Sequence, residues 1–272
     1  MSNLIKIRRG YADTSFGQIH YYDTGSNDLP PLLLLHQSPQ AANMFEAALP
    51  ILGERFRAVA IDTLGYGQSD KPDRVLETED YAQSILEVAD ALGLGRFAIC
   101  GVHTGATFAI QVAIQKSDRV TAVALSAPPL HPPLPHQGAP RRQPRMKPPP
   151  PPREDGNHLS ELWQARWQVA APMDPKAFQK RFLTAIATVD SSISAYHAVY
   201  KYDLTERIKL ITCPVFIVYG DRDVETPNIE QVLHLIPDVP THVIPGGNIY
   251  TIDVCTDEWC TAVGDFCRQA LS

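Results

Sequence analysis

One stretch of the chain places a proton-transferring side chain between two glycines. His103 lies just after an apolar run that ends at Gly101, and Gly105 follows two residues later. Glycines at this spacing suit a strained strand-to-helix turn, because strand and helix approach each other closely on both sides of the central residue. Histidine tolerates a positive φ better than bulky or branched residues do. We therefore expect His103 at the tip of a sharp turn, where an imidazole can move protons near neutral pH.

The elements around this turn predict an α/β fold with a mostly parallel sheet flanked by helices. After a hairpin at Tyr11–Tyr22, apolar runs typical of buried strands alternate with helical patterns, and they do so again beyond residue 213. Such alternation gives parallel strands joined by right-handed crossovers. The expected strands are 31–36, 57–62, 97–101, 120–125, 214–220 and 241–245, and the expected helices are 44–52, 81–92, 106–113, 227–236 and 257–270.

The alternation stops between residues 127 and 206. Half of the chain's 24 prolines lie between Pro128 and Pro152, which excludes a helix or a central strand there. Helical patterns follow at 159–171, 175–187 and 194–202, and Asp174 before Pro175 is typical of a helix N-cap. The predicted organisation is a core in two parts, 1–126 and 207–272, separated by a Pro-rich segment and helical cap at 127–206.

Four motifs occur in the order and at the separations found in the α/β-hydrolase superfamily. They are His36-Gln37-Ser38-Pro39 after the first long strand, Asp62-x-x-Gly65-Tyr66-Gly67-x-Ser69-Asp70-x-Pro72, the turn around His103, and Gly220-x-x-Asp223 after a later strand. Outside 127–206 nearly the whole chain resembles this superfamily, and most of all its capped branch of epoxide hydrolases, dehalogenases and carbon–carbon bond hydrolases. The resemblance implies the α/β-hydrolase fold with a helical cap inserted after strand 6.

The resemblance also identifies three catalytic positions, and two of them are changed here. In the family the elbow holds Ser, Asp or Cys, a Gly-x-x-Asp loop supplies the acid, and a His follows the last strand. In this chain the elbow holds His103, the acid loop keeps Asp223, and Asn248 stands where the family has its His. A Ser-His-Asp acyl-enzyme mechanism is not implied, because neither the hydroxyl nor its base is present.

The two changed positions compensate for each other in size. An imidazole reaches farther from the backbone than a serine hydroxyl, and Asn248 is smaller than the His it replaces. We therefore expect His103 to fill the vacated space and to hydrogen-bond Asp223, either directly or through Asn248. In this hypothesis Asp223 orients the ring and His103 is the general base. The helix N-terminus disfavours the imidazolium and the carboxylate favours it, which predicts a pKa of His103 near neutrality.

Backbone donors at the same turn predict a site that stabilises an oxyanion. The N–H of Thr104 lies at the start of a helix, where it has no intrahelical partner. Gln37 supplies a candidate second N–H, and His36, Gln37 and Thr104 form the predicted substrate-binding set. The alternative is that His36 and Gln37 only satisfy the loop backbone. Ser38 is a further candidate nucleophile without an evident base, and Tyr196 either faces substrate or packs in a core.

These residues predict an enzyme that hydrolyses an ester, lactone or similar carbonyl bond of a small, largely apolar substrate through water activated by His103. Two other functions use the same groups. One is cofactor-independent lyase, isomerase, cyclase or oxygenase chemistry through an enolate. The other is ligand binding without catalysis.

The composition of the chain argues against nucleic acids and membranes as partners. The 272 residues carry a net charge of −6, and no basic segment suggests a nucleic acid or a membrane surface as partner. The N-terminus has no leader pattern and no stretch is long and apolar enough to span a membrane, so we expect a cytoplasmic protein. The five cysteines lack metal-ligand spacing and are expected to be reduced, buried thiols. No metal and no cofactor are expected, the expected partner is a small-molecule substrate, and the oligomeric state is not predicted.

Overall fold

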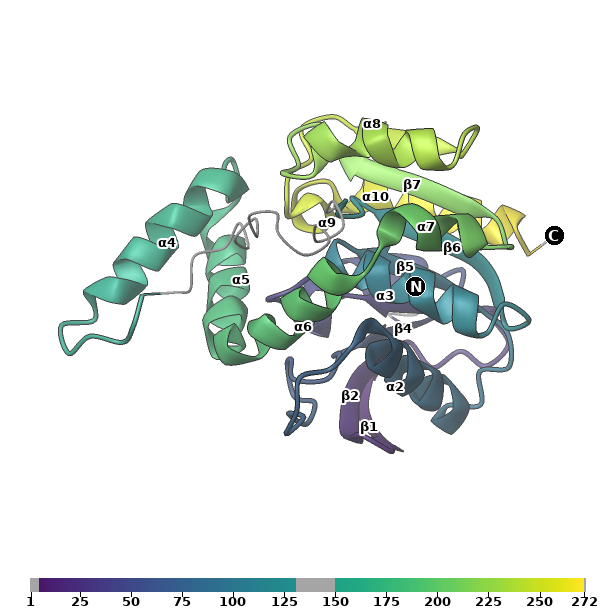
Figure 1. The fold of residues 1–272 in the computed structure, drawn as a ribbon, viewed down its shortest axis with the longest axis horizontal. Helices are drawn as coiled ribbons and strands as arrows, with labels where there is room; N and C mark the ends of the chain where they lie inside the picture. Colours follow the sequence, from purple (N-terminus) through teal and green to yellow (C-terminus); the bar gives the residue numbers. More distant parts are fainter. Residues whose placement is uncertain (1–4, 131–149, 272) are drawn as a thin grey trace, which may run out of the picture.

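Apolar runs form the mostly parallel sheet at the centre of the protein (Figure 1). The structure is a computed structural model that describes residues 5–130 and 150–271, and within these residues the sheet has eight strands in the order β1-β2-β4-β3-β5-β6-β7-β8. The β1–β2 hairpin and the β2–β4 pair are antiparallel, and the other neighbours are parallel, so the predicted mostly parallel sheet is confirmed. The strands are β1 (Arg8–Thr14), β2 (Gly17–Asp23), β3 (Pro31–Leu35), β4 (Arg57–Ile61), β5 (Phe97–Val102), β6 (Val120–Ser126), β7 (Val215–Gly220) and β8 (Thr241–Ile244).

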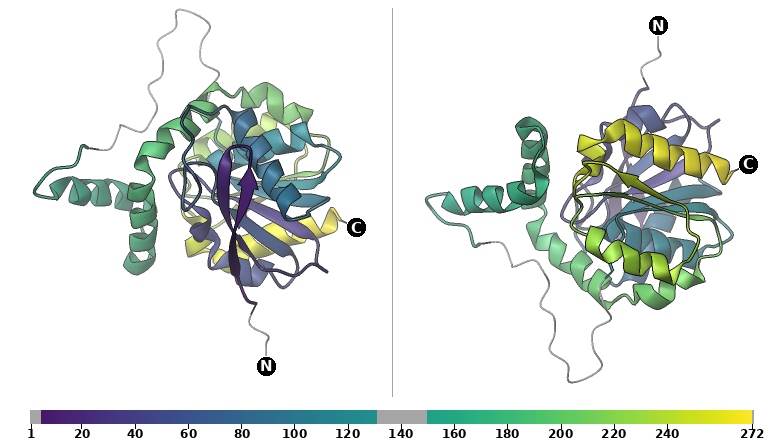
Figure 2. Two further views of the ribbon diagram at one scale, coloured as in Figure 1. Left: turned by 90° about the horizontal axis from the view of Figure 1, so that it is seen from below. Right: turned by 90° about the horizontal axis from the view of Figure 1, so that it is seen from above.

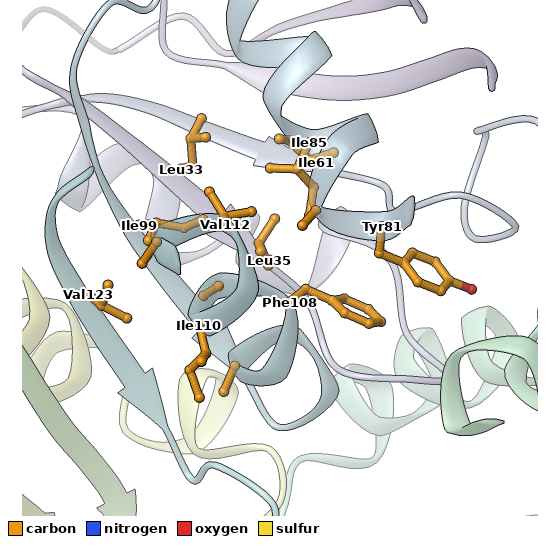
Figure 3. Close-up of a cluster of buried hydrophobic side chains, with 14 of the residues drawn as sticks. Leu33, Leu35, Ile61, Tyr81, Ile85, Ile99, Phe108, Ile110, Val112 and Val123 are labelled. Carbon is orange, nitrogen blue, oxygen red and sulfur yellow. The ribbon is translucent and has the colours of Figure 1, made fainter. Parts of the chain in front are cut away.

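Helices cover both faces of the sheet (Figure 2). The longer ones are α2 (Thr78–Ala91), α3 (Thr104–Gln115), α8 (Thr226–Leu235) and α10 (Thr256–Gln269), and the short ones are η1 (Ala42–Phe45), α1 (Ala48–Leu52), α7 (Leu204–Arg207), η2 (Ile208–Leu210) and α9 (Thr251–Val254). Successive side chains of a strand point to opposite faces. Leu33 and Leu35 therefore join one apolar cluster with α2, α3 and α8, part of which Figure 3 shows. Leu32 and Leu34 join a second cluster with α1 and α10.

Three helices stand between β6 and β7, where the sequence predicts a helical cap. They are α4 (Asn157–Ala170), α5 (Pro175–Ala187) and α6 (Val189–Lys201), called the inserted helices below, and α4 lies farthest from the sheet (Figures 1 and 2). The Asp174 side chain accepts a hydrogen bond from the N–H of Ala177 at 2.9 Å, so the predicted N-cap is confirmed. Most of the predicted Pro-rich segment, 131–149, lies outside the described residues.

A buried ion pair fastens the inserted helices to the core. Arg181 of α5 is 3% exposed, and its guanidinium donates to both carboxylate oxygens of Asp253 in α9, at 2.8 and 2.9 Å. The same guanidinium donates to the carbonyl oxygen of Met44 at 3.2 Å. Removing one partner of a buried pair costs about 3–5 kcal/mol. This contact therefore holds α5 in place against η1 and α9.

Two expectations about local structure are wrong. The expected helix 44–52 is divided into η1 and α1. Pro50 has no N–H to donate to the carbonyl oxygen of Glu46, and its ring would clash with that carbonyl, so one continuous helix cannot pass through this segment. Not every thiol is buried. All five cysteines are free, but Cys213 and Cys255 are partly exposed.

None of the helices in the described part of the chain is long and apolar enough to cross a membrane.

Candidate active site

The turn between β5 and α3 holds His103 in a strained conformation. Its φ of 47° and ψ of −114° lie outside the regions that most side chains adopt. A Cβ on Gly101 would stand 2.1 Å from the Gly105 carbonyl oxygen, and a Cβ on Gly105 would stand 2.4 Å from the Leu35 carbonyl oxygen. Both glycines are therefore needed for strand, turn and helix to approach as closely as they do.

This turn brings His103 to Asp223, which follows β7. Nε2 of His103 lies 3.0 Å from Oδ2 of Asp223, and both side chains are buried. An ionised carboxylate only accepts hydrogen bonds, so the neutral ring carries its proton on Nε2 and keeps a lone pair on Nδ1. No hydrogen bond among the described residues uses Nδ1 of His103. The pair is arranged as a base and the carboxylate that orients it.

Opposed effects act on the pKa of His103. Burial lowers this pKa, but the charge and the hydrogen bond of Asp223, with the charge of Glu225, raise it above its ordinary value of 6.5. The carboxylates therefore outweigh burial. His103 keeps its proton to a higher pH than an isolated histidine, and its base form dominates on the alkaline side of that raised pKa.

Glycines let the loops after β7 and β8 approach each other. A Cβ on Gly220 would lie 2.2 Å from the carbonyl carbon of Gly247. In the first of these loops, Oδ1 of Asp223 accepts a hydrogen bond from the N–H of Glu225 at 2.9 Å. One carboxylate oxygen of Asp223 is thus held by the backbone, and the other faces His103.

Asn248 lies in the loop after β8, and its amide contacts the inserted helices. Nδ2 donates to the carbonyl oxygen of Ala170 at 2.6 Å, and Oδ1 accepts from the N–H of Tyr250 at 2.8 Å. Of the two expected routes between His103 and Asp223, the structure contains the direct one. The Asn248 amide instead joins its loop to the end of α4.

The loop after β3 packs against the start of α3. The N–H of Ser38 donates to Oγ1 of Thr104 at 2.7 Å, and the Thr104 hydroxyl donates to Oγ of Ser38 at 3.1 Å. No hydrogen bond of the described residues uses the backbone N–H of Gln37, and Thr104 is the first residue of α3, where the N–H has no intrahelical acceptor. Both backbone donors are therefore left without an acceptor among the described residues.

His36 and Gln37 have different surroundings. The Thr63 N–H donates to Nε2 of His36 at 3.1 Å, so Nδ1 carries the proton and donates to the Gln37 carbonyl oxygen at 3.0 Å. Burial lowers the pKa of His36, which keeps the ring neutral, and both of its nitrogens are occupied. The Gln37 side chain is buried too, but its Oε1 has no hydrogen-bond partner. Of the two residues, Gln37 presents the unpaired polar atom.

Two further residues complete the surroundings of the His103–Asp223 pair. The hydroxyl of Tyr196, from α6, donates to the Ser38 carbonyl oxygen at 2.8 Å, and burial raises its pKa, so it stays protonated. Glu225 is buried, and its Oε2 accepts from the Asn228 amide at 2.8 Å. Glu225 is not among the expected site residues, although its place two residues beyond Asp223 is a signal that could have found it.

The groups assembled here suit proton transfer and the stabilisation of a negative oxygen. Within residues 5–130 and 150–271, no group of three or more His, Cys, Asp or Glu side chains could hold a metal ion.

Sequence comparison finds relatives among hydrolases. The family model described as alpha/beta hydrolase fold matches residues 30–248. Haloalkane dehalogenase 2 of Mycobacterium tuberculosis is 38% identical over 114 residues, which are 42% of this chain and 39% of that protein. The chain thus spans about two fifths of the length of that relative. The 2-(acetamidomethylene)succinate hydrolase of Mesorhizobium japonicum is 26% identical over 252 residues, 87% of each chain.

Solved structures share the arrangement of the sheet and its helices. The enol-lactonase from Burkholderia xenovorans LB400 has a TM-score of 0.78 and 19% identity, over 94% of this chain and 99% of that one. The naproxen esterase from Bacillus subtilis has a TM-score of 0.75 and 19% identity, over 96% and 92%. At these identities the likeness concerns the fold alone.

Proposed function

The chain belongs to the alpha/beta hydrolase fold family, and from this premise we propose that it hydrolyses an ester, lactone or related carbonyl bond of a small substrate. The nucleophile is water activated by His103. The observation that carries the proposal is the 3.0 Å contact between Nε2 of His103 and Oδ2 of Asp223 at a strained turn. Such backbone strain costs about 1–3 kcal/mol and clusters at active sites, where it is part of the mechanism.

Proton transfer in this proposal runs through Nδ1 of His103. Asp223 accepts the Nε2–H and holds the ring, and Nδ1 takes a proton from water as the water oxygen attacks the substrate carbonyl carbon. The carbonyl oxygen becomes an oxyanion, which the N–H groups of Thr104 and Gln37 stabilise. The protonated ring then gives its proton to the leaving oxygen as the bond breaks. This step restores neutral His103 and releases an acid and an alcohol.

The other expected site residues have supporting roles in this proposal. His36 holds the peptide of Gln37, whose buried Oε1 accepts a hydrogen bond from the substrate. An unpaired buried acceptor costs about 1–3 kcal/mol, so a substrate donor at that atom relieves a penalty. Asn248 positions the inserted helices, which serve as the cap over a core formed by 1–126 and 207–272.

The relatives support hydrolysis as the class of reaction, but they do not identify the bond that is hydrolysed. Their names describe a haloalkane dehalogenase, esterases, and a hydrolase of an acetamidomethylene succinate, which are chemically different substrates. The proposal therefore depends on the site, whose donors suit a carbonyl oxygen that becomes negative.

Hydrolysis of p-nitrophenyl butyrate and of dihydrocoumarin in ¹⁸O-labelled water tests the proposal. We expect solvent oxygen in the acid product, no turnover by His103→Ala, turnover by Ser38→Ala, and no labelling of the native protein by a fluorophosphonate. Stoichiometric labelling of a serine, or turnover that survives in His103→Ala, would refute the mechanism. Turnover without solvent oxygen in the product would favour enolate chemistry, and ligand returned unchanged would favour a binding protein.

A further inference from the structure

The buried turn 37–40 carries one of the two proposed oxyanion donors, the N–H of Gln37. The N–H of Gln40 donates to the Gln37 carbonyl oxygen at 2.8 Å and closes the turn. An unpaired polar group of a buried backbone costs free energy, so such a turn needs partners for its other N–H and C=O groups. These partners come partly from the core and partly from the inserted helices.

The core holds the first half of the turn. Nδ1 of His36 donates to the Gln37 carbonyl oxygen at 3.0 Å. The N–H of Ser38 donates to Oγ1 of Thr104 at 2.7 Å. This carbonyl and this N–H belong to one planar peptide group, which is therefore held at both of its polar ends. The Gln37 N–H belongs to the preceding peptide group and has no hydrogen-bond acceptor among the described residues.

The inserted helices hold the second half of the turn. The hydroxyl of Tyr196, in α6, donates to the Ser38 carbonyl oxygen at 2.8 Å. The Thr188 hydroxyl, between α5 and α6, donates to the Pro39 carbonyl oxygen at 3.1 Å, but it also lies 3.0 Å from the Thr184 carbonyl oxygen. A hydroxyl has one proton, so Thr188 shares its proton between the turn and α5. Tyr196 therefore provides the stronger of the two restraints.

The position of Tyr196 is fixed by contacts of α6 with the core. α6 leads from α5 back to the sheet (Figure 1). The Thr78 hydroxyl, at the start of α2, donates to the Ala198 carbonyl oxygen of α6 at 3.1 Å. The hydroxyl of Tyr202, at the end of α6, donates to Oε1 of Gln111 in α3 at 3.0 Å. The Tyr196 hydroxyl thus approaches the turn from a helix that the core holds.

We propose that the inserted helices position the oxyanion donor of the core, and that Tyr196 is the positioning residue. The inference rests on the proposed function, because it takes the Gln37 N–H as an oxyanion donor. Such a donor stabilises the developing charge only at a suitable distance and direction, and most when it is held there before the reaction. By restraining the Ser38 carbonyl, the Tyr196 hydroxyl limits the rotation that would point the Gln37 N–H away from the oxyanion. It acts through the turn and touches no substrate.

Two tyrosine variants test the inference kinetically. Tyr196→Phe removes the hydroxyl that holds the turn. Tyr202→Phe is the matched control, because its hydroxyl binds α3 at Gln111, about 10 Å along the helix from Thr104. For p-nitrophenyl butyrate, Tyr196→Phe should lower kcat about 5- to 50-fold and change KM less than about twofold, a part of what the loss of a whole oxyanion donor costs. Tyr202→Phe should change both constants less than about twofold.

The two kinetic constants separate positioning from other roles of the hydroxyl. A hydroxyl that only stabilises the fold would make Tyr196→Phe and Tyr202→Phe alike, and a hydroxyl that binds the substrate would change KM. Equal losses of kcat in the two variants, or a rise of KM in Tyr196→Phe with kcat unchanged, would overturn the inference. Urea unfolding checks that both variants are folded under the assay conditions.

Binding of p-nitrophenyl propylphosphonate separates the inference from the proposed function. This anion has the tetrahedral shape and the charged oxygen of the intermediate in p-nitrophenyl butyrate hydrolysis. By calorimetry, the native protein and Tyr202→Phe should bind it alike, and Tyr196→Phe about 5- to 50-fold more weakly. Weaker binding by Tyr196→Phe alone, without ester hydrolysis by the native protein, overturns the proposed function and keeps the inference. Ester hydrolysis with no phosphonate binding, or with equal binding by all three proteins, keeps the function and overturns the inference.

Discussion

Two buried histidine–aspartate pairs in this protein have nearly the same contact and different surroundings. Nδ1 of His20 lies 2.8 Å from Oδ2 of Asp62, and Nε2 of His103 lies 3.0 Å from Oδ2 of Asp223. All four side chains are buried. The contact alone therefore does not distinguish a structural pair from a catalytic one.

The two pairs differ in the backbone conformation and in the hydrogen bonds that surround them. His20 lies in the regular strand β2, with tyrosine rings at centroid distances of 5.2 and 5.0 Å. Asp62 also accepts the N–H groups of Ala42 and Gln68, at 2.6 and 2.9 Å, so three donors satisfy its carboxylate. This pair ties β2 to the loop after β4. We infer that its role is to hold the fold.

The His103–Asp223 pair has fewer hydrogen bonds to the rest of the protein, and polar atoms next to it have no hydrogen-bond partner in the part of the chain that the structure describes. His103 occupies a strained turn, and Asp223 has one backbone donor besides the ring. The N–H of Thr104 at the start of α3 and the buried Oε1 of Gln37 have no partner in the described residues. Unused donors and acceptors beside a strained histidine support the proposal that a ligand completes this site.

The largest expected difference between the pairs is in turnover. His103→Gln should lower kcat/KM for ester hydrolysis about 10²- to 10⁴-fold, because it removes the proposed general base. His20→Gln should change kcat/KM less than about threefold and lower the free energy of unfolding by about 1–3 kcal/mol. Steady-state kinetics of both variants measures the change in kcat/KM, and urea unfolding measures the change in the free energy of unfolding. Similar losses of turnover in the two variants would remove the distinction between the pairs.

The next difference is in stability. Asp62→Ala should lower the free energy of unfolding by about 3–5 kcal/mol, because it leaves His20 and two backbone N–H groups without their acceptor. Asp223→Ala should lower it by about 1 kcal/mol, since it removes one backbone contact and frees a ring that can remain neutral. Urea unfolding at pH 7 compares them. A larger loss in Asp223→Ala would make that pair the structural one.

The pH dependence of turnover sharpens the comparison further. Hydrolysis should rise with pH through a midpoint above 6.5, because the carboxylates raise the pKa of the His103 base. Asp223→Asn should lower kcat/KM about 10- to 100-fold and move this midpoint to lower pH, since it removes the charge that raises the pKa. Asp62→Asn serves as the control. A midpoint that moves with Asp62→Asn, or stays in Asp223→Asn, would contradict the assignment of the base.

The smallest expected effect is the pH dependence of stability, which has opposite signs for the two pairs. The raised pKa of His103 stabilises the fold in full below 6.5, and this contribution is lost as pH rises through the raised value. Burial raises the pKa of Asp62, but the hydrogen bond with His20, the interaction with His36 and the backbone donors lower it below 3.8. Its contribution is present above 3.8 and is lost as pH falls through the lowered value.

Unfolding curves across pH test these signs. His103→Gln should flatten the dependence of the unfolding free energy on pH above 6.5, and Asp62→Asn should flatten it below 3.8. Exchange of the two effects between the variants would show that the pKa directions are assigned to the wrong pair.

The strands, the helix cap and the sharp turn could be predicted from the sequence. The residues that meet at the candidate site could be predicted only in part. The strands, the N-cap at Asp174 and the turn around His103 depend on residues a few positions apart. The division of the expected helix 44–52 between Phe45 and Ala48 was also readable, because Pro50 excludes a helical hydrogen bond to the carbonyl oxygen of Glu46. In contrast, Glu225 was not among the expected site residues, although it lies only two positions beyond Asp223 and is buried.

The sequence by itself determined the α/β alternation and the sharp turn, because hydrophobic period and glycine spacing act over short distances along the chain. The resemblance of its four motifs to the α/β-hydrolase superfamily implied the fold family and the candidate pair. Only the tertiary structure decided that His103 contacts Asp223 directly and that the Asn248 amide binds the end of α4. His103 and Asp223 are 120 residues apart, and their contact joins the turn after β5 to the loop after β7. Which of several polar side chains meet at a site is set by that packing, which a linear pattern does not contain.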